Sequence, residues 1–279
     1  MRFNSDQIQK IGKEISNKVD GKTLFDEFSR GRYSTDASVY QIKPLGVVLP
    51  KDTNDVLSLM EYSQKNSVPL LARGGGSSQC GQTVGESVVL DYSKHQNKIL
   101  ELNVEEKYVW VQPGVVLDHL NAYLKPHGLW FPVDVSTSSR ATIGGMSANN
   151  SCGSRSLYYG NMVHNVLAIE AILDDGSIFN FDQINKNYLA TKNNQDRLYK
   201  IIDKFIDVRQ KVGSEIDANW PTTQRRVGGY NIDLIDPEGF NSSNLLVGSE
   251  GTLSLFNKIK LKLSEIPKNK ILGVCYFDN

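Results

Sequence analysis

The chain has few cysteines, few histidines and no excess of charge of either sign. Only three cysteines occur in 279 residues, Cys80, Cys152 and Cys275, and none stands in a CxxC pair. Such a sparse and odd number argues against a disulfide framework and against a zinc or iron–sulfur site. Lysine plus arginine and aspartate plus glutamate both total 31, so the net charge is about zero. A nucleic-acid partner, which usually requires a basic excess, is therefore not expected.

Long hydrophobic runs are also absent. No run reaches the length of a transmembrane segment, and the polar first 22 residues lack the apolar core of a signal peptide. We therefore expect a cytoplasmic protein, with peripheral attachment to a membrane left open. Apolar residues make up 39% and charged residues 22% of the chain, which is ordinary for a globular protein.

Hydrophobic periodicity predicts an α+β fold with small mixed sheets. The spacing of apolar residues indicates helices, and short apolar or alternating runs indicate strands. Helices are expected at 4–18, 52–66, 115–125 and 195–211. Strands are expected at 46–49, 68–73, 86–92, 98–103, 107–114, 165–181 (as a pair), 257–264 and 270–279.

A glycine loop, RGGGSSQCGQ at residues 73–82, follows the second expected strand. Successive glycines allow main-chain N–H groups to converge on one anion, and serine hydroxyls add further donors. A Rossmann turn instead requires its glycines between the first strand and its helix, so this loop is of another kind. On chemistry alone the alternative is a flexible surface loop.

Two further segments have the composition of ligand-binding loops. The stretch STSSRATIGGMSANNSCGS, residues 136–154, is rich in glycine, hydroxyl and amide side chains. Thr142 could simply cap a helix that begins near Ile143, and a helix N-terminus can also bind an anion. The motif GSEGTL, residues 248–253, could equally be a turn between strands.

Together these motifs resemble the FAD-binding domain of the vanillyl-alcohol oxidase / p-cresol methylhydroxylase (PCMH-type) superfamily. The resemblance spans residues 40–263 and implies two α+β subdomains with FAD between them. RRVGGYNIDLI, LLVGSEGTLSL and DYSKHQNKILELN are most similar to the branch of D-lactate dehydrogenase, the glycolate oxidase flavin subunit and D-2-hydroxyglutarate dehydrogenase.

The resemblance assigns cofactor contacts to each motif. In that family the glycine loop holds the FAD pyrophosphate through main-chain amides, and the later motifs lie beside the flavin. Carried over, the contacts are Arg73, Gly74, Gly75, Gly76, Ser77, Ser78, Gly81, Gln82, Ser136, Thr137, Ser138, Thr142, Gly144, Gly145, Asn149, Glu250 and Gly251, with Ile169 near the adenosine half.

One departure from the family bears on how FAD is attached. Many relatives have a loop histidine that bonds covalently to the flavin, whereas this chain has Ser77 there. We therefore expect non-covalent FAD. The four histidines, His95, His119, His127 and His164, are not at metal-ligand spacing, so no metal site and no catalytic base are assigned.

The resemblance implies oxidation of a D-2-hydroxy acid, whose α-hydrogen would pass to the flavin as hydride. Arg155, Arg226 and Tyr230 are candidates for the substrate side, although each arginine could be ordinary surface charge. Two alternatives remain: a branch acting on sugars or alditols, and a flavin-binding module without turnover of its own. The electron acceptor is not indicated.

We expect three segments along the chain. Residues 1–40 form an N-terminal helical extension, 41–265 the FAD-binding domain, and 266–279 the start of a substrate domain that this chain lacks. The substrate domain, as a C-terminal continuation or a partner subunit, would supply the catalytic base.

Overall fold

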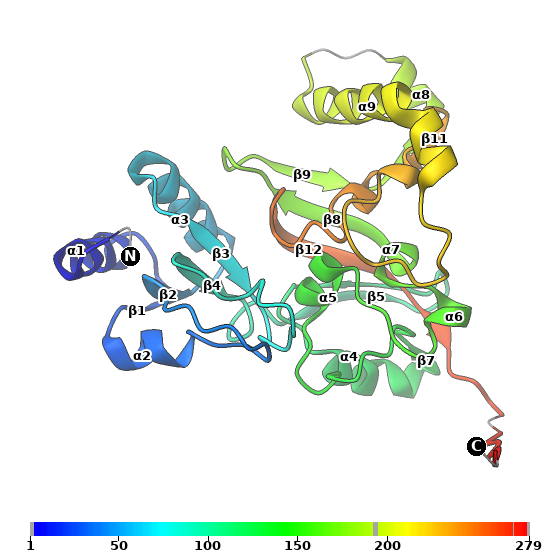
Figure 1. The fold of residues 1–279 in the computed structure, drawn as a ribbon, viewed down its shortest axis with the longest axis horizontal. Coiled ribbons are helices and arrows are strands. Elements are labelled where there is room, and N and C mark those ends of the chain that lie inside the picture. Colours follow the sequence, from blue (N-terminus) through cyan, green and yellow to red (C-terminus); the bar gives the residue numbers. More distant parts are fainter. Residues whose placement is uncertain (1–2, 192–194, 270, 278–279) are drawn as a thin grey trace.

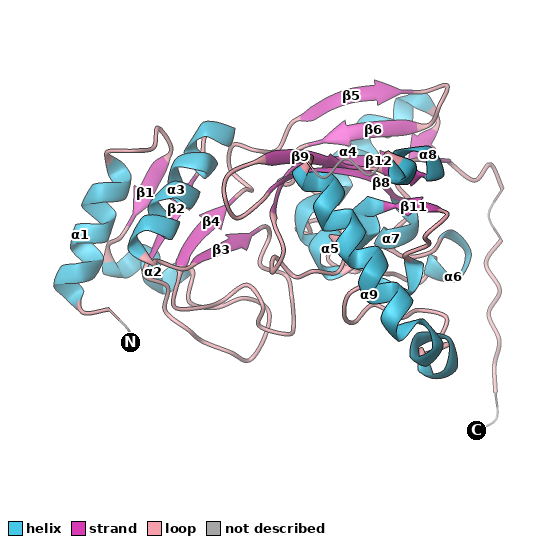
Figure 2. Ribbon diagram, turned by 90° about the horizontal axis from the view of Figure 1, so that it is seen from above, coloured by secondary structure: helices cyan, strands magenta, loops and turns pink. Residues whose placement is uncertain are grey.

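Two β-sheets, each with its own helices, lie side by side along the long axis of the molecule (Figures 1 and 2). The computed structural model describes residues 3–191, 195–269 and 271–277. The chain completes the first sheet before it enters the second, so the first unit forms from a continuous segment. The fold is α+β, as the sequence predicts.

The first sheet has four strands in the order β1-β2-β4-β3. Strands β2, β4 and β3 are parallel, and β1 is antiparallel to β2. Because parallel neighbours require a crossover, α3 connects β2 to β3. The elements of this unit are α1 (Ser5–Ser16), β1 (Lys22–Leu24), α2 (Glu27–Arg32), β2 (Gly46–Leu49), α3 (Thr53–Asn66), β3 (Leu70–Arg73) and β4 (Val88–Asp91).

The second sheet has five antiparallel strands in the order β5-β6-β12-β8-β9. Its strands are β5 (Ile99–Asn103), β6 (Tyr108–Val111), β8 (Val166–Ile172), β9 (Ile178–Phe181) and β12 (Leu255–Lys262). Around it lie α4 (Leu117–Leu124), η1 (Lys125–His127), β7 (Leu129–Trp130), α5 (Ile143–Asn149), α6 (Ser156–Tyr159), α7 (Met162–Asn165) and β13 (Ser264–Glu265). A smaller unit contains β10 (Gln183–Asn185), α8 (Lys186–Ala190), α9 (Arg197–Asn219), η2 (Ile232–Leu234), β11 (Gly239–Asn241) and η3 (Ser242–Leu245).

Local sequence signals account for most of these elements. Asp52 caps α3 by accepting hydrogen bonds from the main-chain N–H groups of Asn54 and Asp55, as its position before the helix predicts. Helix α9 extends to Asn219, beyond the expected end at residue 211. The predicted strand at 270–279 is not found: residues 271–277 have no strand assignment, and residues 270, 278 and 279 lie outside the described part. A strand requires a neighbour for its hydrogen bonds, and no described strand pairs with this run.

The segment before residue 41 is built into the first unit. Ile8, Ile11 and Ile15 of α1 are buried in the core of this unit, and β1 adds a strand to its sheet. The two sheets also meet directly, because Ile172 and Leu255 of the second sheet belong to the same apolar cluster. The domain boundaries at 40 and 265 stay predictions.

Candidate functional site

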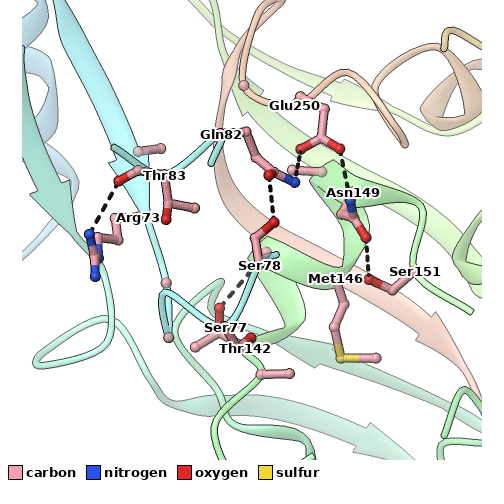
Figure 3. A pocket seen from close by; sticks show the side chains of 18 of the residues that line it. Arg73, Ser77, Ser78, Gln82, Thr83, Thr142, Met146, Asn149, Ser151 and Glu250 are labelled. Carbon is pink, nitrogen blue, oxygen red and sulfur yellow. Dashed lines mark hydrogen bonds between the residues drawn. The ribbon is translucent and has the colours of Figure 1, made fainter. Parts of the chain in front are cut away.

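A cavity of about 430 Å³ lies where the two sheets meet. β3 and the glycine loop form one wall, and α5 with the segment before it and the start of β12 form the other. The structure thus brings the three motifs, which are far apart in the sequence, to one cavity (Figure 3). The predicted contacts that line it are Arg73, Gly74, Gly75, Gly76, Ser77, Ser78, Gln82, Ser136, Thr137, Thr142, Gly144, Gly145, Asn149, Glu250 and Gly251.

At Gly74 and Gly75 the glycine loop is packed so closely that a side chain would not fit. A Cβ at Gly74 would lie 2.0 Å from Oγ1 of Thr142, and one at Gly75 would lie 2.2 Å from the carbonyl oxygen of Arg140. Gly76 has φ +61°, a conformation that glycine adopts without strain. Within the described part of the chain, none of the main-chain N–H groups of residues 74–79 donates a hydrogen bond to another protein atom. These donors are therefore available to a ligand in the cavity.

Arg73 lines the cavity, but its guanidinium is held by main-chain carbonyl groups. It donates hydrogen bonds to the carbonyl oxygens of Tyr33 (3.3 Å), Thr35 (2.8 Å) and Thr83 (3.2 Å). Burial lowers the pKa of this guanidinium, and the neighbouring Asp91 carboxylate opposes that effect. Arg73 therefore fastens the glycine loop to the N-terminal segment, and the loop's free donors are its main-chain amides.

Thr142, directly before α5, both caps this helix and lines the cavity. Its side chain caps α5, accepting a hydrogen bond of 3.3 Å from the main-chain N–H of Gly145, and it also contacts Gly74 in the cavity wall. Gly144 permits close packing, since a Cβ there would lie 2.6 Å from Cβ of Pro113. The helix start thus serves as a structural cap and as part of the wall.

Glu250 connects all three motifs. Its carboxylate accepts a hydrogen bond of 2.8 Å from Nδ2 of Asn149 in α5 and one of 3.2 Å from Nε2 of Gln82 in the glycine loop (Figure 3). Glu250 has φ +52°, a left-handed conformation that costs a non-glycine residue about 1–2 kcal/mol. Such strain persists where the surroundings fix the backbone, as at binding sites.

We expect Glu250→Ala to weaken FAD binding roughly fivefold, because about 1 kcal/mol of hydrogen bonding to Gln82 and Asn149 is lost at this exposed position. Glu250→Gln is the matched control: it removes the negative charge and keeps one of the two oxygens that accept hydrogen bonds from these amides. FAD affinity is measured by quenching of flavin fluorescence. Wild-type affinity in both variants would show that the bridge does not hold the site together.

Three predicted contacts do not line the cavity. Gly81 packs against the ring of Tyr40, where its φ of +80° favours glycine. Ser138 is absent from the wall, and Ile169 is fully buried in the core of the second sheet. Strand β8 is buried on both faces. Its hydrophobic pattern therefore does not distinguish a residue in the core from one that contacts a ligand. The geometry gives these three residues no place in the site.

The predicted substrate residues are also engaged elsewhere. Nη2 of Arg226 contacts both carboxylate oxygens of Asp233, at 2.8 and 2.9 Å, and borders a separate cavity of about 220 Å³. His164 borders the same cavity, and burial followed by the Arg226 charge lowers its pKa. Nε of Arg155 lies 3.6 Å from Asp134, and the Tyr230 hydroxyl lies 2.8 Å from Oγ1 of Thr252. These contacts do not place the three residues together.

The cavity wall also contains residues that the sequence did not single out. They include Cys80, Cys152, Tyr92, Val227 and Ser254. Tyr92 directly follows β4, the parallel neighbour of β3, so its position beside the glycine loop could have been inferred from strand ends that meet at one edge. The others lie within segments that the sequence analysis marked, Cys80 in the glycine loop and Cys152 in residues 136–154, so their segments were predicted although the individual side chains were not.

The residues present fit a dinucleotide. Unpaired main-chain donors and three successive glycines at 74–76 suit a pyrophosphate, and 430 Å³ lies within the usual range of ligand cavities. In residues 3–191, 195–269 and 271–277, no group of three histidine, cysteine, aspartate or glutamate side chains is arranged to hold a metal ion. None of the helices in that part combines the length and apolar character that a membrane span requires.

The chain is similar to known proteins in both sequence and fold. Residues 44–182 match the family described as an FAD binding domain. The chain is 35% identical to D-2-hydroxyglutarate dehydrogenase of Haemophilus influenzae, over 86% of this chain and 24% of that protein. It is 30% identical to glycolate oxidase subunit GlcD of Bacillus subtilis, over 98% of this chain and 48% of that protein.

A solved structure of alkyldihydroxyacetonephosphate synthase superposes with a TM-score of 0.65 at 18% identity, covering 94% of this chain and 44% of that one. This likeness concerns the fold. The chain spans about a quarter of the D-2-hydroxyglutarate dehydrogenase and about half of the glycolate oxidase subunit that it matches. Taken with the three motifs around one cavity, these findings show that residues 44–182 are an FAD-binding domain of the PCMH type.

Proposed function

We propose that this chain binds FAD non-covalently and is the flavin domain of a D-2-hydroxy-acid dehydrogenase. The substrate class is supported by the 35% identity to D-2-hydroxyglutarate dehydrogenase over 86% of the chain. A small-molecule substrate and a cytoplasmic location belong to the same proposal.

The observation that carries the cofactor assignment is the row of unpaired main-chain N–H groups at residues 74–79, which border the cavity between the sheets. Converging amides bind a phosphate oxygen at short range and carry no counter-charge that would have to be desolvated. In this proposal they hold the pyrophosphate, and the Gln82–Glu250–Asn149 bridge keeps the loop against α5. The flavin, when bound, would supply the hydride acceptor.

The purified protein should be yellow and should release all of its FAD on acid denaturation. The reason is that Ser77 stands at the loop position of the covalent histidine, and no histidine is among the described residues of the cavity wall. Absorbance near 450 nm in the supernatant and in the precipitate measures the two fractions. Flavin that stays with the precipitate would contradict this prediction, and Cys80→Ser and Cys152→Ser would then show whether either cavity thiol is the attachment point.

The substrate class is tested with the protein as it occurs in the cell. Flavin reduction is followed anaerobically with D-2-hydroxyglutarate, D-lactate and glycolate, and separately with sugars and alditols. The proposal predicts bleaching by a D-2-hydroxy acid and none by the L-enantiomer. Reduction by an alditol or sugar alone would assign the protein to the other branch.

A further inference from the structure

A surface segment between α2 and β2, residues 33–41, lies against the glycine loop. The structure describes all nine of its residues, which belong to no helix or strand, and Ser34 is the buried one among them. None of these nine residues is part of the cavity wall. They also precede the residues that match the FAD-binding family, which begin at 44. We call residues 33–41 the clamp segment, because its contacts reach the loop at several points.

The clamp segment holds Gly76 through its main chain. The N–H of Ala37 donates a hydrogen bond of 3.2 Å to the carbonyl oxygen of Gly76. A Cβ at Gly76 would lie 2.5 Å from Nη2 of Arg73, and that same Nη2 donates a hydrogen bond of 2.8 Å to the carbonyl oxygen of Thr35. Gly76 therefore lies between an N–H of the clamp segment and a guanidinium that the clamp segment itself orients.

Two side chains of the clamp segment reach the other end of the loop. Oδ2 of Asp36 accepts a hydrogen bond of 2.8 Å from the hydroxyl of Thr83, and its Oδ1 accepts one of 2.8 Å from the main-chain N–H of Ser38. The ring of Tyr40 packs against Gly81, where a Cβ would lie 2.4 Å from Cδ2 of the ring. Thr83 lines the cavity, so these contacts end at the cavity wall.

The glycines of the loop hold one conformation only where their surroundings fix it, because glycine loses more conformational freedom on folding than any other residue. The segment before α5 approaches Gly74 and Gly75. Gly76 and Gly81, both with positive φ, are instead bounded by the clamp segment and by Arg73. When only a fraction of the loops has the binding conformation, the ligand affinity falls by that fraction. Whatever fixes these two glycines therefore contributes to ligand affinity.

We propose that the clamp segment positions the glycine loop for FAD. It holds the loop in the conformation that leaves the main-chain amides of residues 74–79 unpaired, and it acts through the loop without touching the cofactor itself. Asp36 and Tyr40 are the side chains that carry this role. The proposal rests on FAD being the ligand of the cavity, and it makes FAD binding depend on residues outside the matched family domain.

The test measures FAD binding to the apoproteins of Asp36→Ala and Tyr40→Ala by stopped-flow quenching of flavin fluorescence. FAD affinity should fall about 3- to 10-fold in each variant, the effect of one lost contact. The loss should lie in the association rate, because fewer apoprotein molecules have the binding conformation, whereas bound FAD itself holds the loop. The melting temperature of each apoprotein should stay close to that of the wild type, since neither side chain is buried.

Two further variants separate positioning from general effects. Tyr40→Phe keeps the ring that packs against Gly81, so this conservative variant should rescue the affinity that Tyr40→Ala loses. Asp26→Ala is the matched control for Asp36→Ala. Asp26 accepts a hydrogen bond of 2.9 Å from the main-chain N–H of Ser29 at the start of α2, and its loss should leave FAD affinity unchanged.

Three results would overturn the inference. Wild-type affinity in both Asp36→Ala and Tyr40→Ala would show that the loop needs no clamp. A loss that lies only in faster dissociation would indicate direct contact with FAD, and a lower melting temperature with an unchanged association rate would show a structural role. A wild-type apoprotein that binds no FAD would overturn the proposed function and this inference with it, whereas normal wild-type binding with unaffected variants overturns only the inference.

Discussion

Placing an aspartate in the glycine loop, by Gly75→Asp or Ser77→Asp, is expected to abolish FAD binding. Either carboxylate would border the cavity beside the loop amides. Repulsion between two unit charges at about 4 Å and an effective dielectric of about 20 is on the order of 4 kcal/mol, or about a thousandfold in affinity. Equilibrium dialysis or retention of yellow colour through gel filtration measures the loss.

The two variants separate charge from packing. Any side chain at Gly75 meets the carbonyl of Arg140, whereas Ser77 already has a Cβ, so Ser77→Asp adds charge without that clash. Gly31→Asp is the control, since a Cβ there meets nothing within 4 Å. Gly21 would be a poor control because a Cβ there would lie 2.3 Å from the carbonyl oxygen of Leu49. Wild-type FAD retention by a folded Ser77→Asp protein would remove the loop from the site.

The isolated chain is expected to bind FAD and yet to show no flavin reduction by D-lactate, D-2-hydroxyglutarate or glycolate, while dithionite bleaches it fully. Hydride transfer requires the donor carbon about 3–3.5 Å from the acceptor and a base within reach. The charged residues in the described cavity wall are Arg73 and Glu250, and both are engaged in hydrogen bonds within the protein. No free cation in that wall is therefore available to hold the substrate carboxylate.

Anaerobic stopped-flow absorbance near 450 nm measures this prediction, with the D-2-hydroxyglutarate dehydrogenase of Haemophilus influenzae as the positive control. Rapid bleaching of the isolated chain by any of the three acids would show that residues 1–279 hold and oxidise the substrate. Arg226→Lys and Arg155→Lys would then be the first variants to measure, followed by Tyr230→Phe. Loss of bleaching in one of them with FAD affinity unchanged would assign that residue to the substrate.

The elements were largely predictable because their signals are local. Asp52 marks the start of α3, and the apolar spacing of Ile8, Ile11 and Ile15 identifies α1. The glycine loop was also predictable, because only glycine tolerates the approach of Thr142 and Arg140 to its main chain. A run of glycines therefore marks the site without knowledge of what approaches it.

Side-chain partners were decided only by the tertiary structure. The sequence alone determined most of the longer strands and helices and the run of glycines at 74–76, since those depend on neighbours a few residues away. It did not determine that Arg73 binds carbonyl groups, that Arg226 pairs with Asp233, or that Glu250 joins Gln82 to Asn149. A long polar side chain can reach many partners, and the packing of the two sheets selects among them.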